Sequence, residues 1–342
     1  MSDPGQPDLG APEREPSQRR QGPRLLSVVA PVFNEETIVP ELHRRIRDAL
    51  DGFTFELVLV DDGSSDETPQ RLLEVSEMDP RVRVVTLSRN FGHQAAITAG
   101  LDYARGDAIV MIDGDLQDPP ELIPQMVEQW RQGSDVVYAV RRERQGETRL
   151  KLTTARWFYG LFSKLAQINL EPNAGDFRLL DRRALDALSS MRERSRFLRG
   201  MTVWIGFTQS AVSYDRDPRF AGETKYTMRR MVRFSFDAIS SFSQLPLQAA
   251  TVLGFVFSTL AFLLIPVAIG FRIAGEFVPG VTTVLLVVLL LGGIQLITVG
   301  IIGEYLGRVY EEVKGRPLYV VRDVVDGDSE ASAEHEADRI DT

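Results

Sequence analysis

Two long uncharged apolar runs in the last third of the chain constrain its fold more than any other feature. They span Ala249 to Phe271 and Val281 to Gly303, and neither contains Asp, Glu, Lys or Arg. Each is long enough to cross the ~30 Å hydrocarbon core of a bilayer as a helix. The connector from Arg272 to Gly280 is short, so the runs predict a two-helix transmembrane hairpin. The alternative is a pair of buried helices in a soluble bundle, but both runs exceed the length of ordinary core helices.

Positive residues around this hairpin predict its orientation. Those that flank it are Arg229, Arg230, Arg233, Arg308, Lys314 and Arg316. The connector carries only Arg272. Cytoplasmic segments beside membrane helices hold an excess of Lys and Arg. We therefore expect a multi-pass plasma-membrane protein with both chain ends, and the large domain before the hairpin, in the cytoplasm.

Composition excludes several classes of protein. A formal charge of −9 argues against a nucleic-acid binder. The chain has no cysteine, which excludes disulfides, thiol catalysis and cysteine-zinc sites. With 3 histidines, a multi-histidine metal site is not expected. Residues 1–23 lack apolar periodicity and Asp323 to Asp341 is strongly acidic, so both segments are expected to be disordered.

Between Leu25 and Val140 the chain alternates strand and helix patterns. Short apolar runs are separated by helical patterns, which favours parallel strands joined by crossover helices. We therefore predict an α/β domain whose mostly parallel sheet has helices on both faces. The apolar runs are Leu25 to Phe33, Phe55 to Val60, Val82 to Leu87, Ala108 to Ile112 and Val136 to Val140.

Polar clusters follow four of these strands. They are Asn34-Glu35, Asp61-Asp62, Ser88-Arg89-Asn90, and the pair Asp113 and Asp115. The carboxyl ends of parallel strands share the sheet edge at which open α/β sheets bind ligands. Carboxylates so placed suit Mg²⁺ or Mn²⁺ shared with substrate phosphates. The alternative for the aspartate pair is an acidic turn that only solvates a loop.

Two amphipathic helices are expected after the alternating region. Apolar residues recur at helical spacing from Glu147 to Ile168 and from Thr227 to Phe242. The second directly precedes the apolar runs, so it should lie in the lipid headgroup plane. The alternative for both helices is packing onto the sheet.

Four motifs in this order resemble glycosyltransferase family 2. They are Pro31-Val-Phe-Asn-Glu-Glu36, Asp61-Asp-Gly-Ser64, Asp113-Gly-Asp-Leu-Gln117 and Gly222-Glu-Thr-Lys-Tyr226. The chain is most similar to the polyprenyl-phosphate branch, which includes dolichol-phosphate mannose synthases and bactoprenol glucosyltransferases. The resemblance covers about Leu25 to Tyr319. It implies a GT-A-like fold, a nucleotide-sugar donor and transfer of one sugar to polyprenyl (undecaprenyl) phosphate.

The resemblance also implies a donor site. The positions that would bind the nucleotide sugar are Pro31, Phe33, Glu35, Asp61, Asp62 and Asp113. Phe33 stands where Tyr is frequent in the family. The positions that would bind Mg²⁺ or Mn²⁺ and the diphosphate are Asp113, Asp115 and Gln117. A metal ion there stabilises the leaving nucleotide diphosphate, and this makes Asp115 a candidate catalytic residue.

A polyprenyl phosphate acceptor would need positive groups, because it is already an anion and must approach an anionic donor. Arginine makes bidentate contacts with phosphate. The candidate acceptor-phosphate residues are Arg141, Arg142, Arg156, Arg219 and Lys225. The alternative for the first three is a solvated or lipid-facing basic face, and for Arg219 and Lys225 a surface loop.

Asp176 is the second candidate catalytic residue. It precedes the strand-like Phe177 to Leu180, and the resemblance implies that it lines the acceptor side, as a base or as a positioning group. The alternative is a turn-forming aspartate. His93, which opens a predicted helix, is assigned a structural role.

Two other functions compete with this interpretation. Processive family members carry a Gln-x-x-Arg-Trp motif, but Thr153 stands at the glutamine position before Arg156-Trp157. This departure and the two predicted spans argue against a polysaccharide synthase. A non-catalytic membrane scaffold is disfavoured because Asp113, Asp115 and Gln117 are intact.

The predicted organisation has five parts. Residues 1–23 are disordered, 24–226 form the GT-A-like domain, 227–246 an interfacial helix, 247–306 the hairpin, and 307–342 a cytoplasmic segment with the acidic tail. Gly292, Gly293, Gly300 and Gly303 would permit close helix packing in a homo-oligomer.

Overall fold

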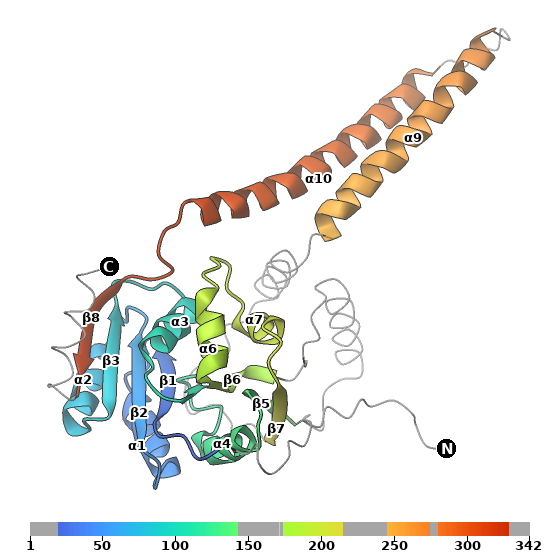
Figure 1. The fold of residues 1–342 in the computed structure, drawn as a ribbon. Coiled ribbons are helices and arrows are strands. Elements are labelled where there is room, and N and C mark those ends of the chain that lie inside the picture. Colours follow the sequence, from blue (N-terminus) through green and yellow to red (C-terminus); the bar gives the residue numbers. More distant parts are fainter. Residues whose placement is uncertain (1–19, 143–170, 172–173, 215–244, 274–279, 328–342) are drawn as a thin grey trace. The chain divides into compact units, whose positions relative to one another are not determined.

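The computed structural model describes residues 20–142, 171, 174–214, 245–273 and 280–327 (Figure 1). The chain divides into two compact units. The first contains the described residues up to 214 and those from 317 onward, and the second contains residues 245–273 and 280–316. Each unit is described by itself.

The first unit is built on one eight-stranded sheet with the order β7-β5-β6-β4-β1-β2-β3-β8. Its strands are β1 (Leu26–Val32), β2 (Phe55–Asp61), β3 (Val82–Leu87), β4 (Ala108–Met111), β5 (Val136–Arg141), β6 (Ala174–Asp181), β7 (Gln209–Tyr214) and β8 (Val321–Asp326). Strands β4, β1, β2 and β3 are parallel neighbours, as predicted. Strand β6 lies antiparallel between β4 and β5, and β8 is antiparallel to β3. The carboxyl ends of β1 to β4 therefore meet at one edge.

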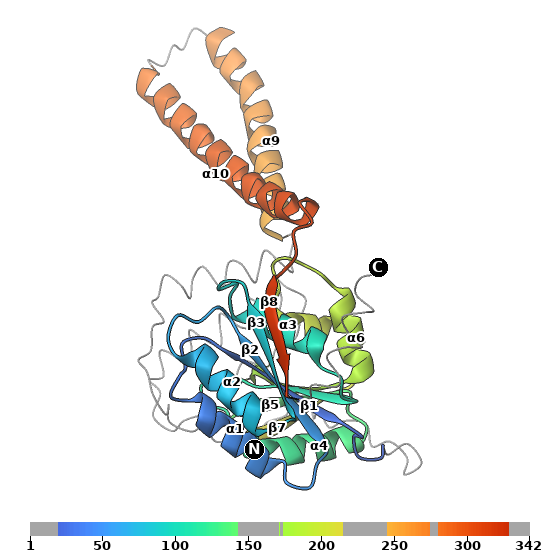
Figure 2. The same cartoon turned by 90° about the vertical axis from the view of Figure 1, so that its left-hand side faces the viewer.

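Helices cover both faces of this sheet (Figures 1 and 2). They are α1 (Val39–Ala49), α2 (Thr68–Met78), α3 (His93–Tyr103), the 3₁₀ turn η2 (Pro120–Leu122), α4 (Ile123–Arg131), α6 (Arg182–Ser190) and α7 (Leu198–Trp204). Proline stands in the first turn of α1, α2 and α4, where its missing N–H is not needed. The predicted α/β fold with helices on both faces is confirmed.

The packing explains which helix covers which face. Leu42 of α1 and Met126 of α4 join one continuous core with alternate residues of the strands, such as Leu57. On the other face, a Cβ added to Gly100 of α3 would lie 2.3 Å from Val29 Cγ1 and 2.9 Å from Val60 Cγ2. The backbone of α3 therefore rests directly on β1 and β2. Burial on both faces accounts for the continuous apolar runs in the sequence.

Two segments that the sequence analysis expected to be disordered contribute to this unit. Residues 321–326 form β8, although the acidic stretch was expected to be disordered from Asp323 onward. Arg83 of β3 is buried and pairs with both Asp326 and Glu56, which neutralises the acid at the end of β8. At the other terminus, Arg20 donates to the Ser134 carbonyl at 2.7 Å and stacks on the Trp130 ring.

The second unit contains α9 (Leu245–Ile273) and α10 (Val281–Val313), which contact each other as an antiparallel pair. Large apolar side chains such as Phe262 and Leu296 are exposed on them. By length and composition, Leu290–Val313 is the one candidate membrane span within the described residues. The predicted pair of helices is thus present, and the predicted pair of spans is supported in part. The amphipathic helices expected at 147–168 and 227–242 lie outside the described residues.

Candidate active site

The loops after β1 and β2 interlock at the carboxyl edge of the sheet. The backbone N–H of Asn34 donates to Ser64 Oγ at 3.0 Å, and the backbone N–H of Ser65 donates to Asn34 Oδ1 at 2.9 Å. Asn34 has a φ of 53°, a conformation that asparagine tolerates better than most residues. The first two polar clusters therefore form one surface, as their positions at strand ends predicted.

Phe33 is exposed on this surface, whereas Pro31 is buried on β1. The backbone N–H of Glu35 donates to Thr68 Oγ1 at 2.8 Å, so α2 holds the loop that carries Glu35 and Phe33. These three residues were predicted to contact the nucleotide. Their arrangement places one exposed ring, that of Phe33, beside a fixed loop.

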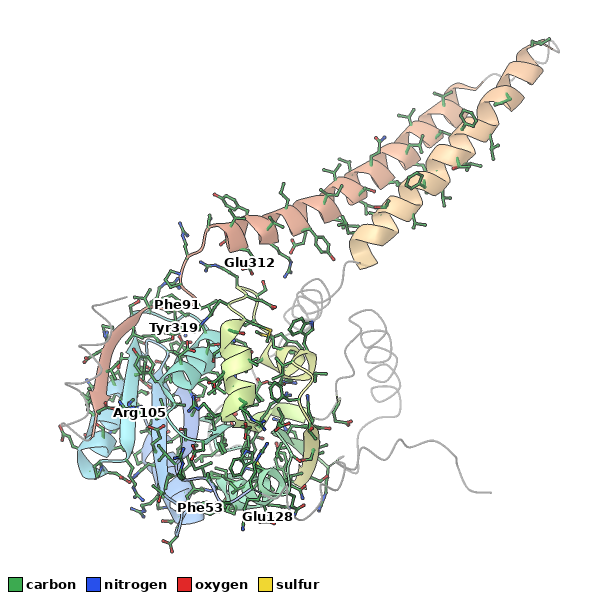
Figure 3. The ribbon with its side chains drawn as sticks, in the orientation of Figure 1. Phe53, Phe91, Arg105, Glu128, Glu312 and Tyr319 are labelled. Atoms are coloured by element: carbon green, nitrogen blue, oxygen red, sulfur yellow. The ribbon has the colours of Figure 1, made fainter. Side chains whose placement is uncertain are left out.

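Asp61 and Asp62 have different surroundings although they are adjacent. Asp61 Oδ1 accepts from the backbone N–H of Ser64 at 2.9 Å, while its buried Oδ2 accepts no hydrogen bond within the described part of the chain. Asp62 accepts from the backbone N–H groups of Phe91 at 2.7 Å and Gly92 at 3.0 Å. Burial raises the pKa of Asp62 despite these two bonds. Asp62 therefore fixes the loop between β3 and α3, where Figure 3 labels Phe91.

This loop delivers His93, the first residue of α3, to a cluster with two carboxylates. His93 Nε2 lies 3.2 Å from Asp113 Oδ1 and 3.6 Å from Asp176 Oδ2. Burial alone would lower the pKa of His93, but its contacts with both carboxylates outweigh burial and raise the pKa to about 10. One ligand atom from each of the three residues lies within 4.8 Å of the others. The raised pKa favours an imidazolium that pairs with both carboxylates.

Asp176 at the start of β6 is held from several sides. Arg199 Nε donates to Oδ1 at 2.8 Å, and Gln94 Nε2 donates to Oδ2 at 3.3 Å. Burial would raise the pKa of Asp176, but His93 and Arg199 together lower it well below its usual range. A carboxylate with so low a pKa is a weak proton acceptor near neutral pH. The arrangement suits a positioning group better than a base.

The residues predicted to bind a metal form a tight turn after β4. Asp115 Oδ1 accepts from the backbone N–H of Gln117 at 3.1 Å, and Gly114 packs so closely that an added Cβ would lie 2.6 Å from the Pro31 carbonyl oxygen. Within the described residues, Asp113 Oδ1 has His93 Nε2 as its neighbour at 3.2 Å, and the buried Gln117 Nε2 donates no hydrogen bond. The carboxylates of Asp113 and Asp115 are oxygen ligands of the kind that a divalent cation prefers.

Arg141, the last residue of β5, faces this turn from the neighbouring half of the sheet. Its Nε donates to Tyr214 Oη at 3.0 Å, and its Nη2 donates to Asp118 Oδ1 at 3.4 Å. Arg142 follows it, and its backbone N–H donates to the Tyr214 carbonyl at 2.9 Å. The other predicted acceptor residues, Arg156, Arg219 and Lys225, lie outside the described residues.

Comparison with known proteins decides the family. A bactoprenol glucosyl transferase of Shigella phage SfII is 39% identical over 300 residues, which cover 87% of this chain and 97% of that protein. The chain belongs to glycosyltransferase family 2. The model of this family, described as glycosyl transferase family 2, matches residues 27–189. A prophage bactoprenol glucosyl transferase homolog of Escherichia coli K12 is 40% identical over 87% of this chain and 99% of its own length. An uncharacterized glycosyltransferase of Synechocystis is 46% identical over 87% of this chain and 95% of its own length.

Solved structures resemble this family 2 chain in fold. Glucosyl-3-phosphoglycerate synthase of Mycobacterium tuberculosis, in complex with Mn²⁺, UDP and phosphoglyceric acid, aligns with a TM-score of 0.46 and 21% identity over 70% of this chain and 82% of its own. Mannosyl-3-phosphoglycerate synthase from Rubrobacter xylanophilus aligns with a TM-score of 0.45 and 19% identity over 63% of this chain and 72% of its own.

Several residues of this glycosyltransferase site were not identified from the sequence. His93 was assigned a structural role, yet the structure places its ring between two carboxylates. Its position directly after the third strand-end cluster was the available signal. Arg199 and Tyr214 lie far along the chain in α7 and β7, and no motif marks them. Asp118 follows Gln117 directly, so the extension of the metal motif by one residue was a usable signal.

Proposed function

We propose that this glycosyltransferase moves one sugar from a UDP- or GDP-sugar to polyprenyl (undecaprenyl) phosphate and releases polyprenyl-phosphate sugar. The observation that carries the proposal is the order β5-β6-β4 in the sheet. It brings Arg141, Asp176 and Asp113 from three adjacent strands to one edge. A cationic group suited to a phosphate acceptor thus lies beside carboxylates suited to a metal-bound donor. The relatives named bactoprenol glucosyl transferase, which match over nearly their whole length, support the lipid acceptor.

The donor side of this edge consists of carboxylates. Asp113, Asp115 and Gln117 would hold Mg²⁺ or Mn²⁺, and Asp61 lies at the end of β2, which β1 separates from β4. When bound, the ion neutralises the diphosphate and stabilises the leaving nucleotide diphosphate. Asp62 and the loop before α3 keep His93 against Asp113, and the exposed ring of Phe33 offers a stacking surface for a nucleotide base.

The acceptor side needs a fixed cation more than it needs a base. A phosphate monoester is already anionic near neutral pH, so its oxygen can attack the sugar without first losing a proton to the protein. The Arg141 guanidinium would hold that phosphate by charge-assisted hydrogen bonds. Asp176, kept ionised by Arg199 and His93, would orient these groups rather than accept a proton.

The position of β8 restricts how residues 245–316 could cross a membrane. Strand β8 follows α10 in the chain, yet it pairs with β3, which precedes α9. Both strands therefore lie on the same side of any membrane, and residues 245–316 must cross it an even number of times. A hairpin of α9 and α10 with the transferase domain at the cytoplasmic face satisfies this condition, and the lysine and arginine distribution favours that face.

The proposal is tested by identification of the lipid product. Membranes that contain the protein are incubated with polyprenyl phosphate, Mg²⁺ or Mn²⁺ and a panel of UDP- and GDP-sugars, and the lipids are analysed by mass spectrometry. We expect one donor to add the mass of a single sugar to the lipid phosphate. Membranes with Asp113→Asn protein serve as the matched control. No sugar-linked lipid with any donor would contradict the proposal.

A further inference from the structure

The cation expected to meet the acceptor rests on a buried polar pair. Tyr214 Oη and Asp118 Oδ1 are hydrogen-bonded to each other, and Arg141 donates to both. The Asp118 side chain is 1% exposed and Tyr214 is 5% exposed, whereas the Arg141 side chain is 30% exposed. The guanidinium is therefore partly exposed to solvent, whereas the Tyr214–Asp118 pair that supports it is buried.

The surrounding packing fixes the Tyr214–Asp118 pair in place. Tyr214 and Arg141 are register partners in the parallel strands β7 and β5. The Tyr214 ring meets Phe177 edge-on, with centroids 6.3 Å apart. Gly175 leaves room for the guanidinium, because an added Cβ there would lie 3.1 Å from Arg141 Nη2. The arginine is thus confined by β5, β6 and β7 together.

The hydrogen bonds also determine which N–H groups remain for a ligand. A guanidinium has five N–H donors. Arg141 uses Nε toward Tyr214 and Nη2 toward Asp118, and within the described residues no protein acceptor is found for Nη1. A buried Asp and Tyr would be a poor choice for packing alone, since burial of a carboxylate is unfavourable unless it is paired. Their placement is explained if they direct the remaining donors outward.

We infer that Tyr214 and Asp118 are positioning residues that hold Arg141 against the acceptor phosphate. The inference rests on the proposed function and adds two residues to it. Asp118 belongs to the same turn as Asp113, Asp115 and Gln117, so it links the acceptor cation to the donor side. Loss of the Tyr214 hydroxyl should weaken use of the acceptor and leave donor binding intact.

Tyr214→Phe in the full-length protein is the direct test, because it keeps the ring against Phe177 and removes only the hydroxyl. We expect the KM for polyprenyl phosphate to rise about tenfold, equivalent to about 1.4 kcal/mol. The KM for the nucleotide sugar and its binding measured by calorimetry should stay unchanged. Asp118→Asn, which keeps the shape of the side chain, should move the same constant in the same direction and serves if Tyr214→Phe does not fold.

Tyr319→Phe is the matched control. Tyr319 Oη also donates to a carboxylate, Asp102 Oδ2, at 2.7 Å, but Asp102 belongs to the last turn of α3, whereas His93 opens that helix. We expect wild-type kinetics for it. In an Arg141→Ala background, Tyr214→Phe should not raise the KM for polyprenyl phosphate further, because Tyr214 acts on the acceptor only through the Arg141 guanidinium.

The outcomes separate the inference from the proposed function. If the wild-type protein forms no lipid-linked sugar, the proposed function fails and the inference fails with it. If the wild type is active and Tyr214→Phe and Asp118→Asn have wild-type acceptor constants, the inference alone is wrong. Additive effects of Tyr214→Phe and Arg141→Ala would likewise overturn it, since Tyr214 would then act independently of the arginine.

Discussion

Asp113 and Asp115 are separated by one residue, yet their carboxylates have different contacts in the structure. Asp113 Oδ1 faces His93 and belongs to the cluster with Asp176. Asp115 Oδ1 caps the backbone of the turn at Gln117, which fixes its carboxylate near the end of β4. The sequence spacing predicts that both carboxylates serve one cation, although the structural cluster with His93 and Asp176 includes Asp113 and not Asp115. If the prediction holds, the loss of either should remove the metal rather than the fold.

Asp115→Ala is expected to lower sugar transfer by about a hundredfold or more, since changes even to groups behind a metal ligand commonly weaken metal binding by about 10–100-fold. Activity of the wild type should also vanish in chelator and return with Mg²⁺ or Mn²⁺. Transfer kinetics and circular dichroism together check this. Asp48→Ala, on the exposed face of α1, is the control. Near-normal turnover by a folded Asp115→Ala protein would refute the metal assignment.

Asp79 provides a pH-dependent contribution to stability away from the site. Hydrogen bonds from Arg81 and His43 outweigh burial and hold its pKa well below the usual range. A depressed folded-state pKa stabilises the protein fully above the unfolded-state value of about 3.9. This contribution begins to fall below that value and is lost as the pH falls through the lower folded-state pKa. Asp79→Asn should therefore destabilise the fold at pH 7 by about 1.5–3 kcal/mol, the range for hydrogen bonds to charged groups.

Thermal midpoints at pH 7 and pH 3 measure this effect. The difference between wild type and Asp79→Asn should be large at pH 7 and should shrink at pH 3. Asp48→Asn, half-exposed on α1, should change little at either pH, as expected for a surface ion pair. An Asp79→Asn deficit that is equally large at both values would show that the carboxylate charge is not its cause.

At the scale of elements, the sequence was informative where structure depends on local pattern. The apolar runs and the helical spacing predicted β1 to β5 and the helices between them. They could not predict that β6 is inserted antiparallel between β4 and β5, because that pairing depends on contacts between residues far apart in the chain. Strand β8 was missed for a different reason, since its acids suggested disorder and only Arg83, buried in β3, reveals a partner for Asp326.

The candidate site also contains residues that the sequence could predict and residues that it could not. Carboxylates at strand ends could be predicted because a parallel sheet places all such ends at one edge. The cluster of His93, Asp176 and Arg199 could not, because it needs α3, β6 and α7 to converge. The contact of Arg141 with Tyr214 and Asp118 could not be predicted either, because it depends on the pairing of β5 with β7.

Strand β8 is expected to be part of the stable transferase domain. Removal of residues 320–342 leaves the edge of β3 unpaired and deprives buried Arg83 of Asp326, and breaking a buried ion pair costs about 3–5 kcal/mol. Arg105 also loses its contact with Asp326 at 3.5 Å (Figure 3). We expect a clear fall in the thermal midpoint and in activity. Removal of residues 328–342 keeps β8 and is the matched control. Equal midpoints for the two truncations would contradict a structural role for β8.

At the scale of the whole molecule, the proposed hairpin requires the chain to return to the side from which it entered the membrane. Because β8 and β3 share one sheet, we expect positions 10 and 335 to lie on one side and position 277 on the other. The lysine and arginine distribution makes the first side the cytoplasm. The chain has no cysteine, so Gly10→Cys, Phe277→Cys and His335→Cys can be labelled singly in intact cells. An impermeant reagent should label only the variant at position 277. Labelling of that position solely after lysis would refute the hairpin.

The most direct test of the proposed function is the stoichiometry of the reaction. Purified full-length protein is given the active nucleotide sugar, Mg²⁺ or Mn²⁺ and polyprenyl phosphate, and both the released nucleotide and the lipid product are counted. One nucleotide diphosphate should appear for each polyprenyl-phosphate sugar, with one sugar on each lipid, and release should depend on the lipid. Release at the same rate without polyprenyl phosphate, or lipids that carry many sugars, would contradict single transfer to a lipid phosphate.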